Sequence, residues 1–552
     1  MSLPEFSTQS YLFSTAALSA SLFPAQDRYR LFAKLVYPRL VKARAQLAAC
    51  YCAEDGRAAI EPVLLLGISI LQYLDGEPDR LAVEMLRYHA GWNFALNRQL
   101  GDPVFHPTTL VNFRARLLER ALSAVGFEAI LDGLVEASLV ARQTRQRLDS
   151  TQMFARVSRM SRLECVRESL RLALRELEGT TAGRPRPDWW PTLWERYVET
   201  KLDYRVEASV LRQKMSAAGG DAAQVLAWVE ALADTGPAAG QQVQVLQRVW
   251  DENFQVGEGS QLQQRELLPP GAVHNPHDPD AQWAAKGQGK DRKEHVGYKI
   301  QIAETLKPDN AAPGEPTANF ITAVVTQPAI GSDEAGLLLV EQEQARMGLD
   351  KPKEWYVDAA YVSAEGLAQA QAQGREIIGP AQPAPTKDGR FNLEQFDVSV
   401  EERRAVCPAG KTSTQCSRLE EQQTGKVTYR FEFSTHCHAC PLRQQCLGKE
   451  QRHRTITVGQ HHTHLQARRR EQRTEAFQRR YRRRNAIEGT QSELVRGHGL
   501  RKARYRGLAK AGLQSYLTAA ACNLKRWVRR VAWQLAQVAQ PASVQLSPAA
   551  AN

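Results

Sequence analysis

Residues 479–530 read "RRYRRRNAIEGTQSELVRGHGLRKARYRGLAKAGLQSYLTAAACNLKRWVRR", and the rest of the chain is best understood from this stretch. In it Glu488 lies among cations, with Arg484 four residues before it and Tyr481 seven residues before it. Residues three and four apart share one face of a helix, so these three side chains are expected to line up. The simplest explanation of the lone acid is an Arg484/Glu488 ion pair on a solvated face.

The charge around this stretch favours another explanation. Residues 461–530 hold 19 Lys and Arg against four carboxylates, a net charge of +15, whereas the whole chain nets +12. So basic a segment is typical of a protein that binds a polyphosphate such as DNA. A carboxylate that faces phosphates repels them unless a divalent cation lies between.

The length and composition limit the class of protein. A chain of 552 residues is too long for one core and predicts three or four units. Its content of 43% apolar and 24% charged residues is that of a soluble globular protein. The N-terminus lacks a signal-peptide pattern and the most apolar run, residues 63–74, is too short to span a bilayer, so we expect a cytoplasmic, nucleoid-associated protein without a membrane partner.

Residues 1–140 are expected to form a helical DNA-binding domain. Apolar residues recur at helical spacing, and "HPTTLVNFRARLLERAL" begins with a helix-start signal and carries Arg114 and Arg116. Such a basic helix can belong to a helix-turn-helix reader of DNA. An amphipathic helix whose polar face is rich in Arg explains the pattern equally well.

The middle of the chain predicts an α/β sheet of mixed direction. Asp149 closes a short extended piece, and the strands "VGYKIQIAET" and "NFITAVVTQP" form a hairpin. A helix, a buried strand ending in Asp358, a second helix and the strand "REIIGP" follow. Reactive groups in such sheets lie at the carboxyl ends of strands, which is where Asp358 is expected. Asp278 is the nearest competitor of Asp149.

Two segments interrupt this sheet. Residues 161–268 are helical and charged and read as an insertion. Residues 381–460 hold five of the nine cysteines, including a C-x-x-C pair in "CHACPLRQQC". Cys407, Cys437, Cys440 and Cys446 can complete a structural zinc site, with Cys416, His436 and His438 as rival ligands and free buried thiols as the alternative.

Without the two insertions, the order of elements is that of an RNase H-like domain. The fold class is therefore an RNase H-like mixed-sheet core with an all-α N-terminal domain and two insertions. We expect the core to comprise 141–160 with Asp149, 269–380 with Asp358, and the basic helices of 461–530 with Glu488, before a flexible tail at 531–552. Three carboxylates on two strands and one helix can hold two divalent cations about 4 Å apart, as in-line displacement at phosphorus requires.

The quoted C-terminal stretch resembles the signature of bacterial insertion-sequence transposases of the DDE type, those with a Tyr, Arg, Glu, Lys motif. "YVDAAYVS" resembles their second-Asp strand, "LDSTQMFA" the first, and "HPTTLVNFRARL" the domain before the core. Tyr481, Arg484 and Glu488 match three members of the motif. Where the family has Lys, this chain has Val495, with Arg496 beside it as a substitute.

The resemblance implies a DNA transposase that cuts at the ends of its element and joins them to target DNA. Asp149, Asp358 and Glu488 would bind two Mg²⁺ or Mn²⁺ ions, and double-stranded DNA would be held by a homodimer assembled on it. The implied DNA contacts are Tyr481, Arg484, Arg496, Arg501, Lys502, Arg504, Arg506, Arg114 and Arg116. Two alternatives are an RNase H-like nuclease without strand transfer and an inactive DNA-binding protein derived from a transposase.

Overall fold

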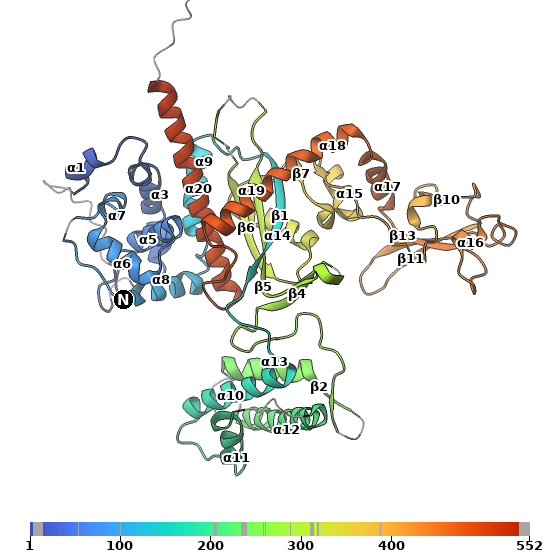
Figure 1. Cartoon of the computed structure of the whole chain (residues 1–552), viewed down its shortest axis with the longest axis horizontal. Coiled ribbons are helices and arrows are strands. Elements are labelled where there is room, and N and C mark those ends of the chain that lie inside the picture. Colours follow the sequence, from blue (N-terminus) through green and yellow to red (C-terminus); the bar gives the residue numbers. More distant parts are fainter. Residues whose placement is uncertain are drawn as a thin grey trace, which may run out of the picture.

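A sheet of six strands lies at the centre of the protein (Figure 1). This computed structural model describes residues 1–3, 15–52, 55–99, 101–201, 207–232, 240–257, 259, 261–287, 289–309, 314–316, 319–386 and 388–539. The strands of the sheet are β1 (Arg145–Phe154), β4 (Gln282–Lys286), β5 (Lys293–Thr305), β6 (Ile321–Pro328), β7 (Glu354–Tyr356) and β8 (Glu376–Ile378).

The sheet is mixed, as the sequence predicts. Its order is β6-β5-β1-β7-β8, and β4 pairs with the first residues of β5 on the edge that β6 also uses. β5 is antiparallel to β1, β4 and β6, whereas β7 is parallel to both β1 and β8. β5 is therefore the one strand of this sheet that runs against the others.

The register of the two central parallel strands brings two acids side by side. Arg147 of β1 pairs with Tyr356 of β7, so two residues further along lie Asp149 and Asp358. The prediction that Asp149 closes its strand is wrong: β1 continues to Phe154, because the long β5 strand pairs with it as far as Gly297.

Helices cover both faces of the sheet. On one face α14 (Asp333–Arg346), capped by Ser332, and α15 (Ala364–Ala372) pack on Leu148 and its apolar neighbours. On the other face lie α19 (Ile487–Ser492) and α20 (Leu508–Ala539) (Figure 1). Since successive residues of a strand point to opposite faces, Arg147 and Asp149 point towards α19.

The N-terminal helices share their hydrophobic core with the sheet. Phe32, Leu66 and Phe127 belong to one buried cluster with Tyr298 of β5 and Trp527 of α20. These helices are α1 (Thr15–Ser19), η1 (Ala20–Leu22), α2 (Arg28–Leu31), η2 (Phe32–Val36), α3 (Tyr37–Lys42), α4 (Arg44–Ala48), α5 (Pro62–Asp75), α6 (Asp79–Tyr88), α7 (Ala90–Ala95), α8 (Thr108–Glu119) and α9 (Val125–Glu136).

The most apolar run of the chain forms helix α5 of this core. Pro62 occupies the first turn, where Glu61 accepts a hydrogen bond from the Val63 amide, and the helix ends at Gly76, whose φ of 83° favours glycine. The residues between are buried almost all round, as in a central core helix. None of the helices that the structure describes is long and apolar enough to cross a membrane.

The helical segment between β1 and β4 has a core of its own (Figure 1). Trp190, Leu246 and Phe254 are buried in it. Its elements are α10 (Arg162–Thr180), α11 (Trp190–Trp194), η3 (Glu195–Glu199), α12 (Ala208–Leu232), α13 (Gln241–Asn253), β2 (Phe254–Val256) and β3 (Leu262–Gln264). Its two ends meet, since the amide of Met160 donates to the carbonyl of His274 at 3.0 Å.

A third unit, which we name the Cys module, comprises residues 391–459. It is built from η7 (Leu393–Gln395), β9 (Asp397–Ser399), β10 (Arg404–Val406), β11 (Gln415–Glu420), β12 (Val427–Glu432), α16 (Arg443–Cys446) and β13 (Thr455–Gly459). Its strands form two small sheets, β10-β9 and β11-β12-β13, over a separate core. Figure 1 shows it projecting from the central sheet beyond α17.

The C-terminal stretch is helical but not one regular helix. After α17 (His462–Glu471), α18 (Glu475–Tyr481) passes through the 3₁₀ turn η8 (Arg482–Ala486), α19 and the π-helical turn η9 (Glu493–Gly497). Tyr481, Arg484 and Glu488 therefore do not share the uniform helix that their spacing predicts. α20 continues to Ala539, so the flexible tail expected from 531 is helical over its first nine residues, and 540–552 lie outside the described residues.

Candidate active site

Asp149 and Asp358 meet around the guanidinium of Arg484. Nη2 of Arg484 lies 2.7 Å from Oδ2 of Asp149 and 3.8 Å from Oδ2 of Asp358. The first acid is held by the middle of β1, and the second follows β7 and caps η6 (Ala359–Tyr361), where it accepts the Ala360 amide at 2.8 Å. Two of the three predicted acids and the predicted arginine thus form one cluster.

The environment of Asp149 disfavours its charge. The residue is 9% exposed, and this burial raises the pKa of its carboxyl group; the Arg484 charge opposes the rise, and the neighbouring Asp358 adds to it. Asp358 is more open, with 38% of its side chain exposed. A buried acid next to a second acid is the arrangement that a bound cation stabilises.

Glu488 lies on the same side of the sheet but apart from this pair. One turn after it, Gln491 donates to the carbonyl of Ser150 at 3.2 Å, which fixes α19 along β1 beside Asp149. The Glu488 side chain is exposed. The three predicted acids do not form a set whose ligand atoms all lie within 4.8 Å of one another, a spacing that among the described residues is met by a different group.

A buried ionic network holds this helical run on the sheet. Glu304 of β5 is fully buried and accepts from Arg147 at 2.6 Å, from Arg526 of α20 at 3.0 Å and from the Thr490 hydroxyl at 2.6 Å. Arg147 also donates to the carbonyl of Arg483, the residue before Arg484. The network joins the sheet, α19 and α20 next to the acid pair.

Tyr481 and a tyrosine missed by the sequence analysis surround the acids. The ring of Tyr481 stacks on Phe477, and burial raises the pKa of its hydroxyl group, with Asp358 and Asp149 adding to the rise and Arg484 opposing it. Burial likewise raises the pKa of Tyr361, which lies near Asp149 and Asp358 and donates to Gln301. A Gln in the middle of the apolar strand "VGYKIQIAET" was the one signal that could have pointed to this contact.

The predicted phosphate-binding segment docks onto the end of β1. We name residues 499–507 the basic loop. The Phe154 amide donates to the Arg501 carbonyl and the Ala503 amide to the Phe154 carbonyl, both at 2.8 Å. Lys502 and Arg506 are exposed, whereas Arg501 packs over the Phe154 ring and Arg504 over that of Tyr73.

An open groove runs beside the basic loop. Its volume is about 1150 Å³, and it is lined by the loop, by the end of β1 and by the turn between α5 and α6. Arg156 and Val495 also line it, and Arg496, next to Val495, is exposed. The groove therefore brings the basic C-terminal stretch and the N-terminal helices to one surface.

Of the two arginines predicted on α8, one cannot contact DNA as expected. Arg114 is 6% exposed, pairs with Asp79 and lies over the Tyr505 ring. Its guanidinium joins the N-terminal helices to the basic loop, so the helical spacing placed it on the wrong face. Arg116 is half-buried and packs over the Tyr51 ring.

Asp278, the sequence competitor of Asp149, has a structural role. It is fully buried and accepts hydrogen bonds from the Tyr298 hydroxyl at 2.7 Å and from the Gly507 amide at 3.0 Å. These contacts tie the end of the basic loop to β5. The carboxylate of Asp278 is therefore occupied by hydrogen bonds inside the protein.

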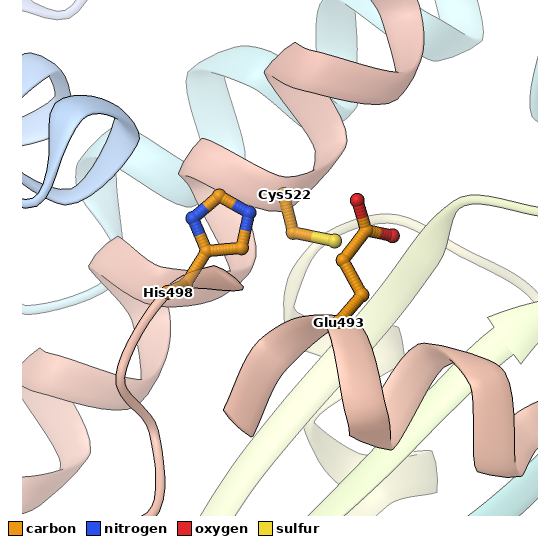
Figure 2. A group of neighbouring side chains, drawn as sticks. All are labelled: Glu493, His498 and Cys522. Carbon is orange, nitrogen blue, oxygen red and sulfur yellow. The ribbon is translucent and has the colours of Figure 1, made fainter. Parts of the chain in front are cut away.

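A different cluster meets the spacing of a metal site among the described residues. Figure 2 shows Glu493, His498 and Cys522 facing one another. Glu493 is already neutralised by Arg526 at 3.0 Å and Lys525 at 3.2 Å. Burial raises the pKa of the Cys522 thiol to about 12, so it stays protonated at neutral pH. A cation there would face two positive side chains and a neutral thiol, and the group is better explained as packing between η9 and α20.

Two family models match the chain. The one described as a transposase domain (DUF772) matches residues 19–116, which span most of the N-terminal helices. The one described as a transposase DDE domain matches residues 406–528, which include Glu488, Arg484, Tyr481 and most of the Cys module. No curated protein matches the chain. The two matches, to residues 19–116 and 406–528, support a DNA transposase function.

Proposed function

We propose that this transposase cleaves DNA at the ends of its mobile element and transfers the resulting 3′-hydroxyl end to target DNA, with Asp149, Asp358 and Glu488 as its catalytic acids. The observation that carries the proposal is the meeting of Asp149 and Asp358 on neighbouring strands around Arg484. Such a pair is suited to phosphoryl transfer with divalent cations.

The strand order supports an RNase H-like core. The central strand β1 carries the first acid, the parallel neighbour β7 leads into the second, and β5 is the one reversed strand of this sheet. The third acid comes from α19, which covers the face towards which Asp149 points.

The donor set fits magnesium or manganese. Carboxylate oxygens are the ligands that these hard cations prefer, and the raised pKa of buried Asp149 indicates a site that gains from added positive charge. Asp149, Asp358 and Glu488 would hold two ions, which when bound activate the attacking oxygen and stabilise the leaving one. Arg484 neutralises the acids in the free protein and, once ions replace it, would bind a phosphate next to the scissile bond.

The DNA is proposed to lie along the groove beside the basic loop. Lys502 lines this groove and is exposed, and Arg506 is exposed at the end of the basic loop, so both can contact phosphates. Arg501 and Arg504 shape the loop through their ring contacts. Arg496 and Tyr481 extend the same basic surface towards the acids. Two ends must be joined in concert, so we propose that a homodimer assembles on DNA.

The test uses purified full-length protein, pre-cut duplexes carrying the ends of its own element, supercoiled plasmid and Mg²⁺. Joined products are expected for the wild type, with a loss of at least about 100-fold for Asp149→Asn and Asp358→Asn. Nicked plasmid without joined products would indicate a nuclease, and binding without any cleavage would indicate an inactive descendant; both results contradict the proposal.

The DNA surface is tested separately by binding. Lys502→Ala and Arg506→Ala should each weaken binding to any duplex and lower the salt slope by about 1, because each removes one phosphate contact. Lys351→Ala is the matched control, since this lysine precedes β7 at the opposite end of the strand from Asp358 and pairs with Glu341 at 3.0 Å. Equal effects of all three changes would exclude the groove as the binding surface.

A further inference from the structure

The Cys module has a small hydrophobic core for its length. Its buried apolar side chains lie in or next to short strands of three to six residues, with Phe431 on β12, Phe396 just before β9 and Phe433 just after β12. Units of this size often need a disulfide or a metal ion to remain folded. All nine cysteines of the chain are free thiols, so no disulfide supplies that stability.

Four of these thiols converge on one cavity. Cys407, Cys437, Cys440 and Cys446 all line a space of about 20 Å³ inside the module. Each comes from a tight local structure. Cys407 begins a turn closed by the Gly410 amide at 2.8 Å, Cys437 and Cys440 belong to one C-x-x-C turn, and Cys446 ends α16. Four identical soft ligands from separate turns thus line one cavity.

The surroundings of the cavity are suited to thiolates. The Arg454 amide points at the sulfur of Cys437 at 3.4 Å, the kind of contact that stabilises a charged sulfur. The guanidinium of Arg454 stacks on Phe396 and donates to the carbonyls of Cys446 and Phe391. Its Nε is buried and has no hydrogen-bond partner among the described residues. A tetrahedral site of four thiolates around Zn²⁺ carries a charge of about −2, which this cation would offset.

Zinc binding changes both the charge and the spacing of the four sulfurs. A coordinating thiol is deprotonated, so the ion would bind four thiolates. The sulfurs must also move closer, since no three of them lie within 4.8 Å of one another whereas a zinc tetrahedron places them about 3.8 Å apart.

We propose that Cys407, Cys437, Cys440 and Cys446 bind one structural Zn²⁺ ion that holds the Cys module together. The rival ligands predicted from the sequence are less well placed. Cys416 lies on β11, paired with Phe431, and neither it nor His438 lines the cavity. His436 does line it and remains the one histidine to test. Four thiolates close the coordination sphere, so the ion would have no open position for catalysis.

The proposal is tested on the full-length protein by zinc content, without DNA. One zinc per chain is expected for the wild type and for the matched control Cys416→Ser, and less than about a fifth of this for Cys440→Ser and Cys407→Ser. His436→Ala should keep its zinc. A wild type without zinc, or equal zinc in Cys416→Ser and Cys440→Ser, overturns the proposal.

A second measurement does not depend on variants that fold. Cobalt added to the chelator-treated wild type should give the visible absorption of tetrahedral thiolate coordination at one equivalent. Alkylation mapped by mass spectrometry should then modify the exposed Cys52 and spare the four ligands. Modification of all four at the rate of Cys52 in the zinc-loaded protein contradicts the assignment. Strand transfer is not measured here, so the result is independent of the proposed activity.

Discussion

At the residue scale, Arg484 supplies positive charge between the two acids of the pair. It contacts both Asp149 and Asp358 from a position 335 residues beyond the first of them in the sequence. Burial still outweighs this ion pair, since the net pKa of Asp149 is raised. Keeping Asp149 ionised in the folded protein therefore costs free energy relative to the unfolded chain, and this cost has a measurable consequence.

Asp149→Asn is expected to raise the thermal unfolding midpoint at pH 7.5. A folded-state pKa above the ordinary value of 3.8 means that the carboxyl group contributes stability at low pH, and that this contribution is lost as the pH rises through the folded pKa. The neutral Asn avoids the loss, so the difference between variant and wild type should shrink as the pH falls towards 4. Differential scanning fluorimetry across this range measures it.

The control is an acid whose pKa is shifted in the opposite direction. Asp309 is exposed and the hydrogen bond from Arg145 lowers the pKa of its carboxyl group, so Asp309→Asn should not raise the midpoint at pH 7.5. Mg²⁺ should raise the midpoint of the wild type more than that of Asp149→Asn. A stabilised Asp309→Asn, or a wild type more stable than Asp149→Asn at pH 7.5, would show that burial does not dominate at Asp149.

Glu304 gives a second prediction at this scale. Replacing its carboxylate by a neutral amide leaves the buried Arg147 and Arg526 without the negative charge that they share, and breaking a buried pair in this way costs about 3–5 kcal/mol. Glu304→Gln should lower the free energy of unfolding by about that amount in urea denaturation. Glu420→Gln, which removes an exposed partner of Arg418, should cost less than about 1 kcal/mol. Similar losses in the two variants would mean that the network contributes little.

At the element scale, the helical run after Tyr481 changes its winding twice. The 3₁₀ turn η8 directs Arg484 into the acid pair, and the π turn η9 closes its hydrogen bonds over one more residue than an α-helix. A π turn therefore acts as a one-residue insertion in the helix. We propose that Arg496, eight residues after Glu488, takes the place that the seventh residue would have in a regular α-helix, and that it thereby replaces the Lys expected at Val495.

Arg496→Ala is accordingly expected to weaken DNA binding and to lower the salt slope by about 1. Val495→Ala, one position away on the same turn, removes no charge and should bind DNA like the wild type. Fluorescence anisotropy with an end duplex at several salt concentrations measures both. If the double change Val495→Lys, Arg496→Ala restored wild-type binding, the register argument would fail.

Much of the sheet could be predicted because its signals are local. β5 and β6 lie where the two quoted strands were expected, and α14 is the helix expected after them. The winding of the helical run could not be predicted, because counting at 3.6 residues per turn assumes a regular helix. The contact of Arg484 with Asp149 joins distant segments, and only the packing of α19 on β1 brings it about. Arg114 was misplaced because helical spacing does not show which face of α8 the basic loop will cover.

At the scale of the whole molecule, the N-terminal helices and the sheet are one folding unit. α20 packs against α5 and α9 on one side and against β6 on the other, within a single buried cluster. The helical segment of residues 162–272 and the Cys module keep separate cores. The domain boundary predicted at residue 140 therefore divides residues that share one hydrophobic core. Each of the two segments predicted as insertions has a hydrophobic core of its own.

This difference predicts two deletion outcomes. Replacement of residues 163–271 by a short Gly/Ser linker should leave a monodisperse, folded protein, because Met160 and His274 already meet at the base of the segment. Removal of residues 1–140 should give aggregated protein, because it exposes the apolar face of α20. Size-exclusion chromatography and circular dichroism show whether each of the two proteins is monodisperse and folded. A well-folded fragment 141–552 would show that the sheet and α20 suffice by themselves.

Because the basic loop docks on the end of β1, this strand fixes the distance between the loop and the acid pair. Asp149 and Phe154 are five residues apart on one extended strand, a span of about 17 Å. Successive phosphates of one strand rise by about 3.4 Å along the axis of duplex DNA. If the axis of a bound duplex runs along β1, a phosphate held at Lys502 places the bond at the acid pair roughly five nucleotides away. The length of β1, and not recognition of the bases, would then set the position of the cut.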